Sequence, residues 1–171
     1  MRPRRILQDG AVYHVSSKVD HDKMGLSKAE VKNEFMAFIE KAHIKFDFEL
    51  INFQILDNHF HILIKPGKGE SLSEIMQWIK CNFAKYWNNL HNTKGHFWGE
   101  RFFSRIIKNA KDFWQTFLYI DNNAVKAKLA ESPLSWVFGG AWFHHNNKMP
   151  LVEVSEWGSI REMAPYHLPA G

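Results

Sequence analysis

The sequence has little cysteine and no long apolar run. Its one cysteine, Cys81, cannot form a disulfide within the chain, which favours a reducing compartment. No apolar run approaches the roughly 20 residues that a membrane-spanning helix needs, so we expect no membrane association. Neither an internal repeat nor a low-complexity tract is present, and a 45% hydrophobic content argues against a disordered chain. These absences predict a globular, cytoplasmic protein.

Charge is unevenly distributed along the 171 residues, a length typical of one domain. Residues 1–130 carry 20 Lys and Arg against 14 Asp and Glu, whereas residues 131–171 carry 2 against 4. The first segment is therefore the candidate functional domain, and the second is a tail that packs on it or remains appended to it. The net charge of +4 and the 15% aromatic content together suggest a nucleic-acid partner.

Hydrophobic periodicity and turn residues predict four strands and three helices. The expected strands are 11–18, 48–56, 59–65 and 101–107, with the second and third forming a hairpin around residues 57–58. The expected helices begin with the capping patterns Ser27 and Glu30, Ser71 and Glu74, and Asp112 and Gln115. The last of these helices is expected to carry Tyr119 and to extend as far as residue 129.

The resulting order, β-α-β-β-α-β-α, predicts an α+β protein. Its first six elements follow the split β-α-β-β-α-β, ferredoxin-like arrangement with an antiparallel sheet. In this arrangement helices cover one face of the sheet and the other face is free to bind a ligand. A C-terminal helix that carries the tyrosine, followed by the tail, completes the expected fold.

His59, Phe60 and His61 form an H-x-H pattern on the third expected strand. Because side chains two apart on a strand share a face, the two imidazoles should lie side by side while Phe60 points into the core. Such a pair can bind one divalent cation. Taken alone, the pattern is better explained by two sheet histidines without a ligand.

Tyr119 and Asn123 lie four residues apart on the last expected helix and so share its face. A phenol next to an amide and near two histidines could act as a nucleophile beside a metal ion. A half-buried structural tyrosine is the simpler explanation. His14 and His96 could help to position a phosphate, although a core and a loop histidine are the simpler explanations.

Four ordered segments resemble one known family. They are Arg2–Ile6 followed by Gly10–Val15, Phe53–Ile64, Gly95–Ser104, and Tyr119 to Leu129. Together they resemble the REP-associated tyrosine transposases, relatives of the single-tyrosine insertion-sequence transposases in the HUH endonuclease superfamily. The sequence departs from the family pattern at Asp57, which is usually proline, and at Ala124, where proline usually follows the asparagine.

The resemblance implies a metal-dependent endonuclease and strand transferase that acts on single-stranded or hairpin DNA, including REP-type DNA. It implies that His59, His61 and Asn123 bind Mg²⁺ or Mn²⁺. Tyr119 would attack a DNA phosphate to give a 5′-phosphotyrosine and a free 3′-hydroxyl. Such an enzyme would associate with the nucleoid and could act as a homodimer.

Basic residues near the expected site are candidates for DNA binding. They are Arg2, Arg4, Arg5, Lys65, Arg101 and Arg105. Trp98, Phe102 and Phe103 could stack on bases, although each is more simply a core residue.

Two alternatives use the same fold. One is a catalytically silent module that binds structured DNA, and the other is an RNA-binding sheet, which would expose stacking aromatics on its central strands.

Overall fold

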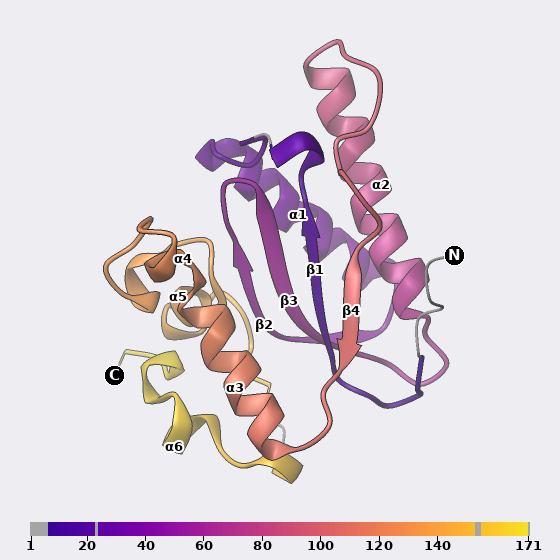
Figure 1. The fold of residues 1–171 in the computed structure, drawn as a ribbon. Coiled ribbons are helices and arrows are strands. Elements are labelled where there is room, and N and C mark those ends of the chain that lie inside the picture. Colours follow the sequence, from indigo (N-terminus) through magenta and orange to yellow (C-terminus); the bar gives the residue numbers. More distant parts are fainter. Residues whose placement is uncertain (1–6, 23, 153–154, 171) are drawn as a thin grey trace.

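The computed structural model describes residues 7–22, 24–152 and 155–170 and contains one four-stranded sheet. All neighbouring strands are antiparallel, in the order β2-β3-β1-β4. The strands are β1 (Tyr13–Lys18), β2 (Phe48–Ile55), β3 (His59–Pro66) and β4 (Phe103–Ile106). This is the predicted split β-α-β-β-α-β topology, and Figure 1 shows the sheet between its helices. Within these described ranges, no helix has both the length and the apolar character needed to cross a bilayer.

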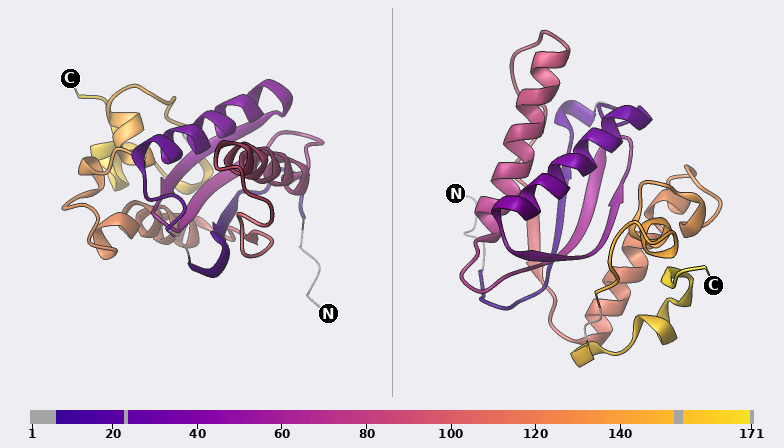
Figure 2. Two further views of the ribbon diagram at one scale, coloured as in Figure 1. Left: turned by 90° about the horizontal axis from the view of Figure 1, so that it is seen from above. Right: turned by 180° about the vertical axis from the view of Figure 1, so that it is seen from behind.

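Helices α1 (Ala29–Lys45) and α2 (Leu72–Leu90) cover one face of the sheet, as the views in Figure 2 show. Their apolar stripes meet the alternate residues of the strands, including Val15, Phe60 and Ile62, in one buried cluster. Phe35 of α1 lies against Phe60, with ring centroids 5.0 Å apart. The predicted inward orientation of Phe60 is therefore confirmed, and this layer fixes the opposite orientation of its histidine neighbours.

The sequence predicted that the other face of the sheet is free, and this is wrong for part of its width. Helix α3 (Ala110–Asp121) and the C-terminal segment pack against it and form a second apolar cluster. That segment contains α4 (Asn123–Lys126), α5 (Gly140–His145), α6 (Ile160–Met163) and the 3₁₀ turns Pro133–Ser135, Ser155–Trp157 and Pro165–His167. Outside this segment, a 3₁₀ turn at Asp20–Asp22 follows β1. The cover arises because Ile51 and Leu63 present an apolar surface on this side.

The tail also covers the free edge of β2. The Ile55 backbone N–H donates to the Phe138 carbonyl at 3.0 Å, and the Trp136 indole N–H donates to the Ile55 carbonyl at 3.0 Å. Gly139 bridges to Gln54 so closely that a Cβ there would collide with the Gln54 amide oxygen. Pairing an exposed edge in this way protects it from pairing with other chains.

A β-bulge in β2 changes the predicted orientation of Ile51. The β2–β3 register shifts between Leu50 and Asn52. The prediction that Ile51, Phe53 and Ile55 share a face is therefore wrong for Ile51, which joins the second cluster while the other two join the first. A bulge inserts one residue and so reverses the alternation locally.

The helix starts differ from the predicted capping patterns at two of three places. Ser71 caps α2 as predicted and accepts a hydrogen bond from the Glu74 N–H. Lys28, not Ser27, precedes α1 and makes no capping bond. The Ser27 backbone carbonyl accepts a hydrogen bond from the Lys32 ammonium. Asn109 caps α3 by accepting from the Asp112 N–H. The third helix also ends at Asp121, before the separate turn α4.

A buried carboxyl at the end of α3 joins this helix to β2 and the tail. Asp121 is fully buried, and its Oδ1 accepts a hydrogen bond from the Asn52 amide at 2.8 Å. Its Oδ2 accepts from the Tyr166 hydroxyl at 2.6 Å and lies 2.9 Å from His167 Nε2. Burial and the adjacent carboxyl raise the pKa of Tyr166, which keeps it a donor. These bonds fix the end of α3 against the sheet.

His144 extends this network. Its Nδ1 lies 2.6 Å from His167 Nδ1, and its buried Nε2 has no hydrogen-bond partner among the described residues. Because the two Nδ1 atoms face each other, one of them carries the proton and the other accepts it. Burial, with a smaller effect of the neighbouring His167, lowers the pKa of His144 to about 3.

We expect Tyr166→Phe to lower the free energy of unfolding by about 1.5–3 kcal/mol, because it removes a hydrogen bond to a buried carboxyl. Urea denaturation followed by circular dichroism measures the change. Tyr86→Phe is the matched control, since the half-buried Tyr86 makes no hydroxyl hydrogen bond to another described residue. Equal effects of the two substitutions would contradict a structural role for the Asp121 network.

We also expect acid destabilisation through His144. An unfolded histidine binds a proton near pH 6.5, whereas folded His144 resists protonation until about pH 3. Its contribution is therefore present above pH 6.5 and is lost as the pH falls towards 3, amounting to about 2 kcal/mol at about pH 5. His144→Met should reduce the loss of stability between pH 7 and 5 by that amount in urea titrations, while exposed His96→Met should leave it unchanged.

Candidate functional site: a tyrosine facing paired histidines

The two histidines of the H-x-H pattern lie together at the start of β3, directly after the turn at residues 57–58. Their ring centroids are 5.0 Å apart and the ring planes are almost perpendicular. His59 and His61 face α3, because the buried Phe60 between them occupies the opposite face. The predicted pairing of the imidazoles is therefore present in the structure.

Tyr119 of α3 reaches this pair within the same chain. Its ring centroid lies 5.4 Å from that of His61, and the phenol remains 41% exposed. The Asn123 side chain, one helical turn further on, lies next to His59, and its amide N–H donates to the Tyr119 carbonyl at 3.1 Å. The four residues selected from the sequence thus meet at one place, and the exposed phenol is open to a ligand.

His14 is a member of the site that the sequence did not select. It lies on β1 opposite Leu63, and its Nε2 is 3.0 Å from His61 Nδ1. The rings of His14 and His61 are stacked with centroids 5.1 Å apart. The signal was present in the pattern Val12-Tyr13-His14-Val15, which places a histidine on the same face as the pair once the strand order is known.

Both buried imidazoles are held in the neutral state. Burial, followed by the charge of Arg105, lowers the pKa of His14 to about 4. Burial, followed by the neighbouring His14 and His59, lowers the pKa of His61 to about 3. Burial also lowers the pKa of His59, with Lys18 adding to the effect. Neutral imidazoles keep a lone pair that can bind a metal ion or accept a proton.

The hydrogen bonds of His59 and His61 involve their Nδ1 atoms and leave their Nε2 atoms available as metal ligands. His59 Nδ1 lies 2.7 Å from the Asn58 side-chain oxygen, so it carries the proton. His61 Nδ1 contacts His14, while the buried His61 Nε2 has no hydrogen-bond partner among the described residues. Metal-bound histidines are oriented in this way, through a bond from the other ring nitrogen. This chemistry fits a divalent cation.

No group of three His, Cys, Asp or Glu side chains is placed to hold a metal in the part of the chain that the structure describes. A cation at the imidazole pair would therefore take an oxygen as its next ligand. The Asn123 amide is next to His59 and can supply one.

The basic residues predicted to bind DNA fall at different distances from this site. Arg105 pairs with His14 across the sheet, and its guanidinium bonds both Asp112 oxygens, at 2.8 and 3.0 Å. Arg101 is exposed in the loop before β4. Lys65 is near the opposite end of β3 from His59, so it does not join the site. Arg2, Arg4 and Arg5 lie outside the described residues.

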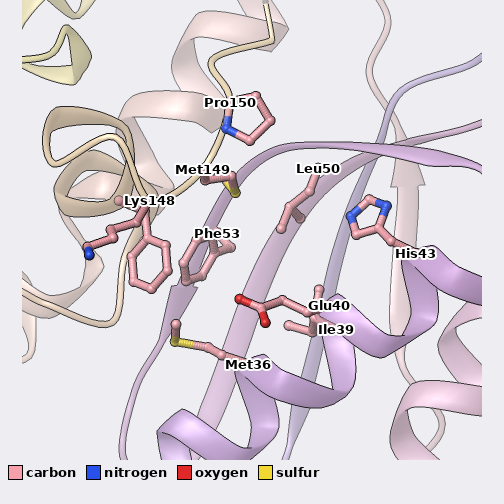
Figure 3. A pocket seen from close by; sticks show the side chains of 10 residues that line it. Met36, Ile39, Glu40, His43, Leu50, Phe53, Lys148, Met149 and Pro150 are labelled. Carbon is pink, nitrogen blue, oxygen red and sulfur yellow. The ribbon is translucent and has the colours of Figure 1, made fainter.

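A separate apolar pocket opens between α1, β2 and the tail (Figure 3). Met36, Phe53 and Met149 line it, with Glu40 and Lys148 nearby. None of the paired histidines, Tyr119 or Asn123 lines this pocket. The chemistry of the candidate site is therefore carried by the sheet face under α3 and not by this cavity.

Comparisons with known proteins show which family the chain belongs to. The family model described as "Transposase IS200 like" matches residues 10–123. A Haemophilus influenzae protein assigned as a REP-associated tyrosine transposase is 23% identical over 165 residues, covering 91% of this chain and 92% of that protein.

Two solved structures share the fold. A REP-associated tyrosine transposase bound to a REP hairpin has a TM-score of 0.73 and 19% identity, over 91% of this chain and 96% of that one. An assigned transposase of Deinococcus radiodurans R1 has a TM-score of 0.50 and 15% identity, over 71% and 97%. The family match spans most of the chain, including the paired histidines and Tyr119, and on that ground the chain belongs to the IS200-like transposase family.

Proposed function

We propose that the protein cuts and rejoins single-stranded DNA next to hairpins of the REP type through a covalent bond to Tyr119. The observation that carries the proposal is the approach of the exposed Tyr119 ring to His61, at 5.4 Å between centroids, beside an unpartnered imidazole nitrogen. The relatives assigned to REP-associated transposition, one of them bound to a REP hairpin, support this choice of substrate.

The reaction is a transfer of a phosphoryl group between oxygen atoms. The Tyr119 oxygen attacks the phosphorus and loses its proton, the bond from phosphorus to the 3′ oxygen breaks, and that oxygen takes up a proton. The products are a 5′-phosphotyrosine and a free 3′-hydroxyl. Because the covalent bond conserves the energy of the cut linkage, the hydroxyl can later attack it and reseal or transfer the strand without ATP.

A divalent cation, Mg²⁺ or Mn²⁺, would be held by His59, His61 and Asn123 and would neutralise charge that develops on the phosphate oxygens. We assign His14 as a positioning residue: its Nε2 lies 3.0 Å from His61 Nδ1, and with the proton on His61 Nδ1 the Nε2 atom of His61 keeps its lone pair for the ligand. The Lys126 ammonium lies 5.0 Å from the centre of the Tyr119 ring and attracts the DNA backbone to the phenol. All these residues come from one chain, so the tyrosine need not be exchanged between subunits of a dimer.

We expect Tyr119→Phe to abolish the covalent adduct while DNA binding is retained. The assay incubates the protein with 3′-labelled stem-loop oligonucleotides of randomised flank sequence and Mn²⁺, and then resolves the adduct by denaturing electrophoresis. The label must be at the 3′ end, because the 5′-phosphotyrosine retains that fragment. Tyr86→Phe is the control and should form the adduct normally.

Persistence of the adduct in Tyr119→Phe would show that the nucleophile is another residue. Binding without any adduct in the unaltered protein would favour the catalytically silent DNA-binding module. Preferential binding of single-stranded RNA would favour the RNA-binding alternative.

We expect His61→Gln to weaken binding of Mn²⁺ by more than about tenfold, since it removes an imidazole ligand. His14→Leu should weaken it by about 10–100-fold, because the orientation of His61 is lost. Isothermal titration of the protein with Mn²⁺ alone measures both effects without reference to cleavage. The control is His96→Gln, in the exposed loop before β4. Unchanged affinity in His61→Gln would exclude the imidazole pair as the metal site.

A further inference from the structure

Two aromatic side chains stand apart from all the others that the structure describes. Each Phe, Tyr and Trp in the described ranges is buried or partly buried, except Phe103, which is 57% exposed, and Tyr119, which is 41% exposed. Single exposed apolar residues are common on proteins, so exposure alone carries no conclusion. Here, however, one of the two exposed rings is the proposed nucleophile, and the other lies on the same face of the sheet.

The strand register places Phe103 in line with the histidine pair. Ser16 of β1 is directly opposite Phe103 of β4 on one side and His61 of β3 on the other. Residues directly opposite on antiparallel strands share a face, so the three side chains form one row. With strands about 4.8 Å apart, the row is roughly 10 Å long. A base that flanks a phosphate at the histidines can therefore reach the Phe103 ring.

The shape of the row suits a flat ligand. Ser16, the half-buried residue in the middle, has a small side chain that leaves the flank of the Phe103 ring uncovered. Phe102, the preceding residue, points the other way and is 7% exposed in the first cluster. Of the aromatics that the sequence suggested for base stacking, Trp98 and Phe102 are therefore occupied by the core, and Phe103 alone is available.

The charges around the row are positive. Arg105 lies two residues from Phe103, on the same face of β4, and its side chain is 38% exposed. Lys18 is exposed on β1, directly opposite His59. Asp112 forms an ion pair with Arg105, so these two groups together carry no net charge, and Lys18 supplies the net positive charge beside the row. An exposed aromatic ring next to basic side chains is the arrangement with which proteins hold single-stranded nucleic acid.

We propose that Phe103 is a base-stacking platform that holds the nucleotide flanking the scissile phosphate. The inference rests on the proposed function, because the histidine pair defines where that phosphate lies. Every base presents an aromatic face, so stacking on Phe103 supplies affinity and placement and does not select a sequence. The platform keeps the strand extended across β1 and β4 while Tyr119 attacks.

A library of stem-loop DNA with randomised single-stranded flanks is first selected for the oligonucleotide that binds most tightly. Fluorescence anisotropy without added metal then measures the affinity of the protein for that oligonucleotide. Phe103→Ala should weaken binding by about tenfold, and Phe103→Trp should retain it. The matched control is Leu90→Ala, which truncates another exposed apolar residue (61% exposed) at the end of α2 and should leave affinity unchanged.

A scan with abasic nucleotides then assigns the contact. In the unaltered protein, removal of one flanking base should lower affinity as much as Phe103→Ala does, and the same oligonucleotide should bind Phe103→Ala no more weakly than the intact one. Unchanged affinity in Phe103→Ala, or a loss spread evenly over all flanking positions, would overturn the proposal. A change in oligomeric state on size exclusion, with unchanged DNA affinity, would also overturn it and assign Phe103 to a protein interface.

Failure of the proposed function gives a different result. Because binding is measured without cleavage, loss of the Tyr119 adduct reaction would leave the abasic-site pattern intact. A missing pattern in a protein that still forms the adduct would reject the platform alone.

Discussion

The position of Tyr119, the proposed nucleophile, depends on one buried carboxyl. Asp121 is fully buried two residues after Tyr119 and binds donors from β2 and from the tail. A buried carboxyl that lost one of these partners would be left with an unmet hydrogen bond in a low-dielectric interior, which is costly. The bonds therefore fix the end of α3 against the sheet. They place the phenol over the histidines and make the C-terminal tail part of the support of the site.

The histidines are held by a similar principle. Burial disfavours the charged imidazole, and it lowers the pKa of His14 and of His61 far enough to keep both rings neutral. Two neutral rings in contact share one proton between His14 Nε2 and His61 Nδ1. The buried His61 Nε2 has no hydrogen-bond partner among the described residues, and the His61 ring centroid lies 5.4 Å from that of Tyr119. Burial thus determines the protonation state of the imidazoles next to Tyr119.

Much of the fold and the site could be predicted from the sequence because it depends on local periodicity. Alternation around His59, Phe60 and His61 determines which side chains share a face, and helical spacing places Asn123 one turn after Tyr119. The predictions that failed depend on distant partners. The bulge at Ile51 arises from the pairing of β2 with β3, and the expected free face of the sheet is covered in part by α3 and the tail.

By itself, the sequence determined the order of strands and helices, the shared face of the paired histidines and the family resemblance, because each is written in the spacing of nearby residues. Only the tertiary structure decided that His14 supports His61, that the tail covers β2 and α3, and that Phe103 is exposed while Phe102 is buried. Those outcomes depend on which strands lie next to one another and on what packs over them. The neighbours of each strand and the segments that cover it are determined by hydrogen bonding and burial between residues far apart in the chain. No local sequence pattern encodes these contacts.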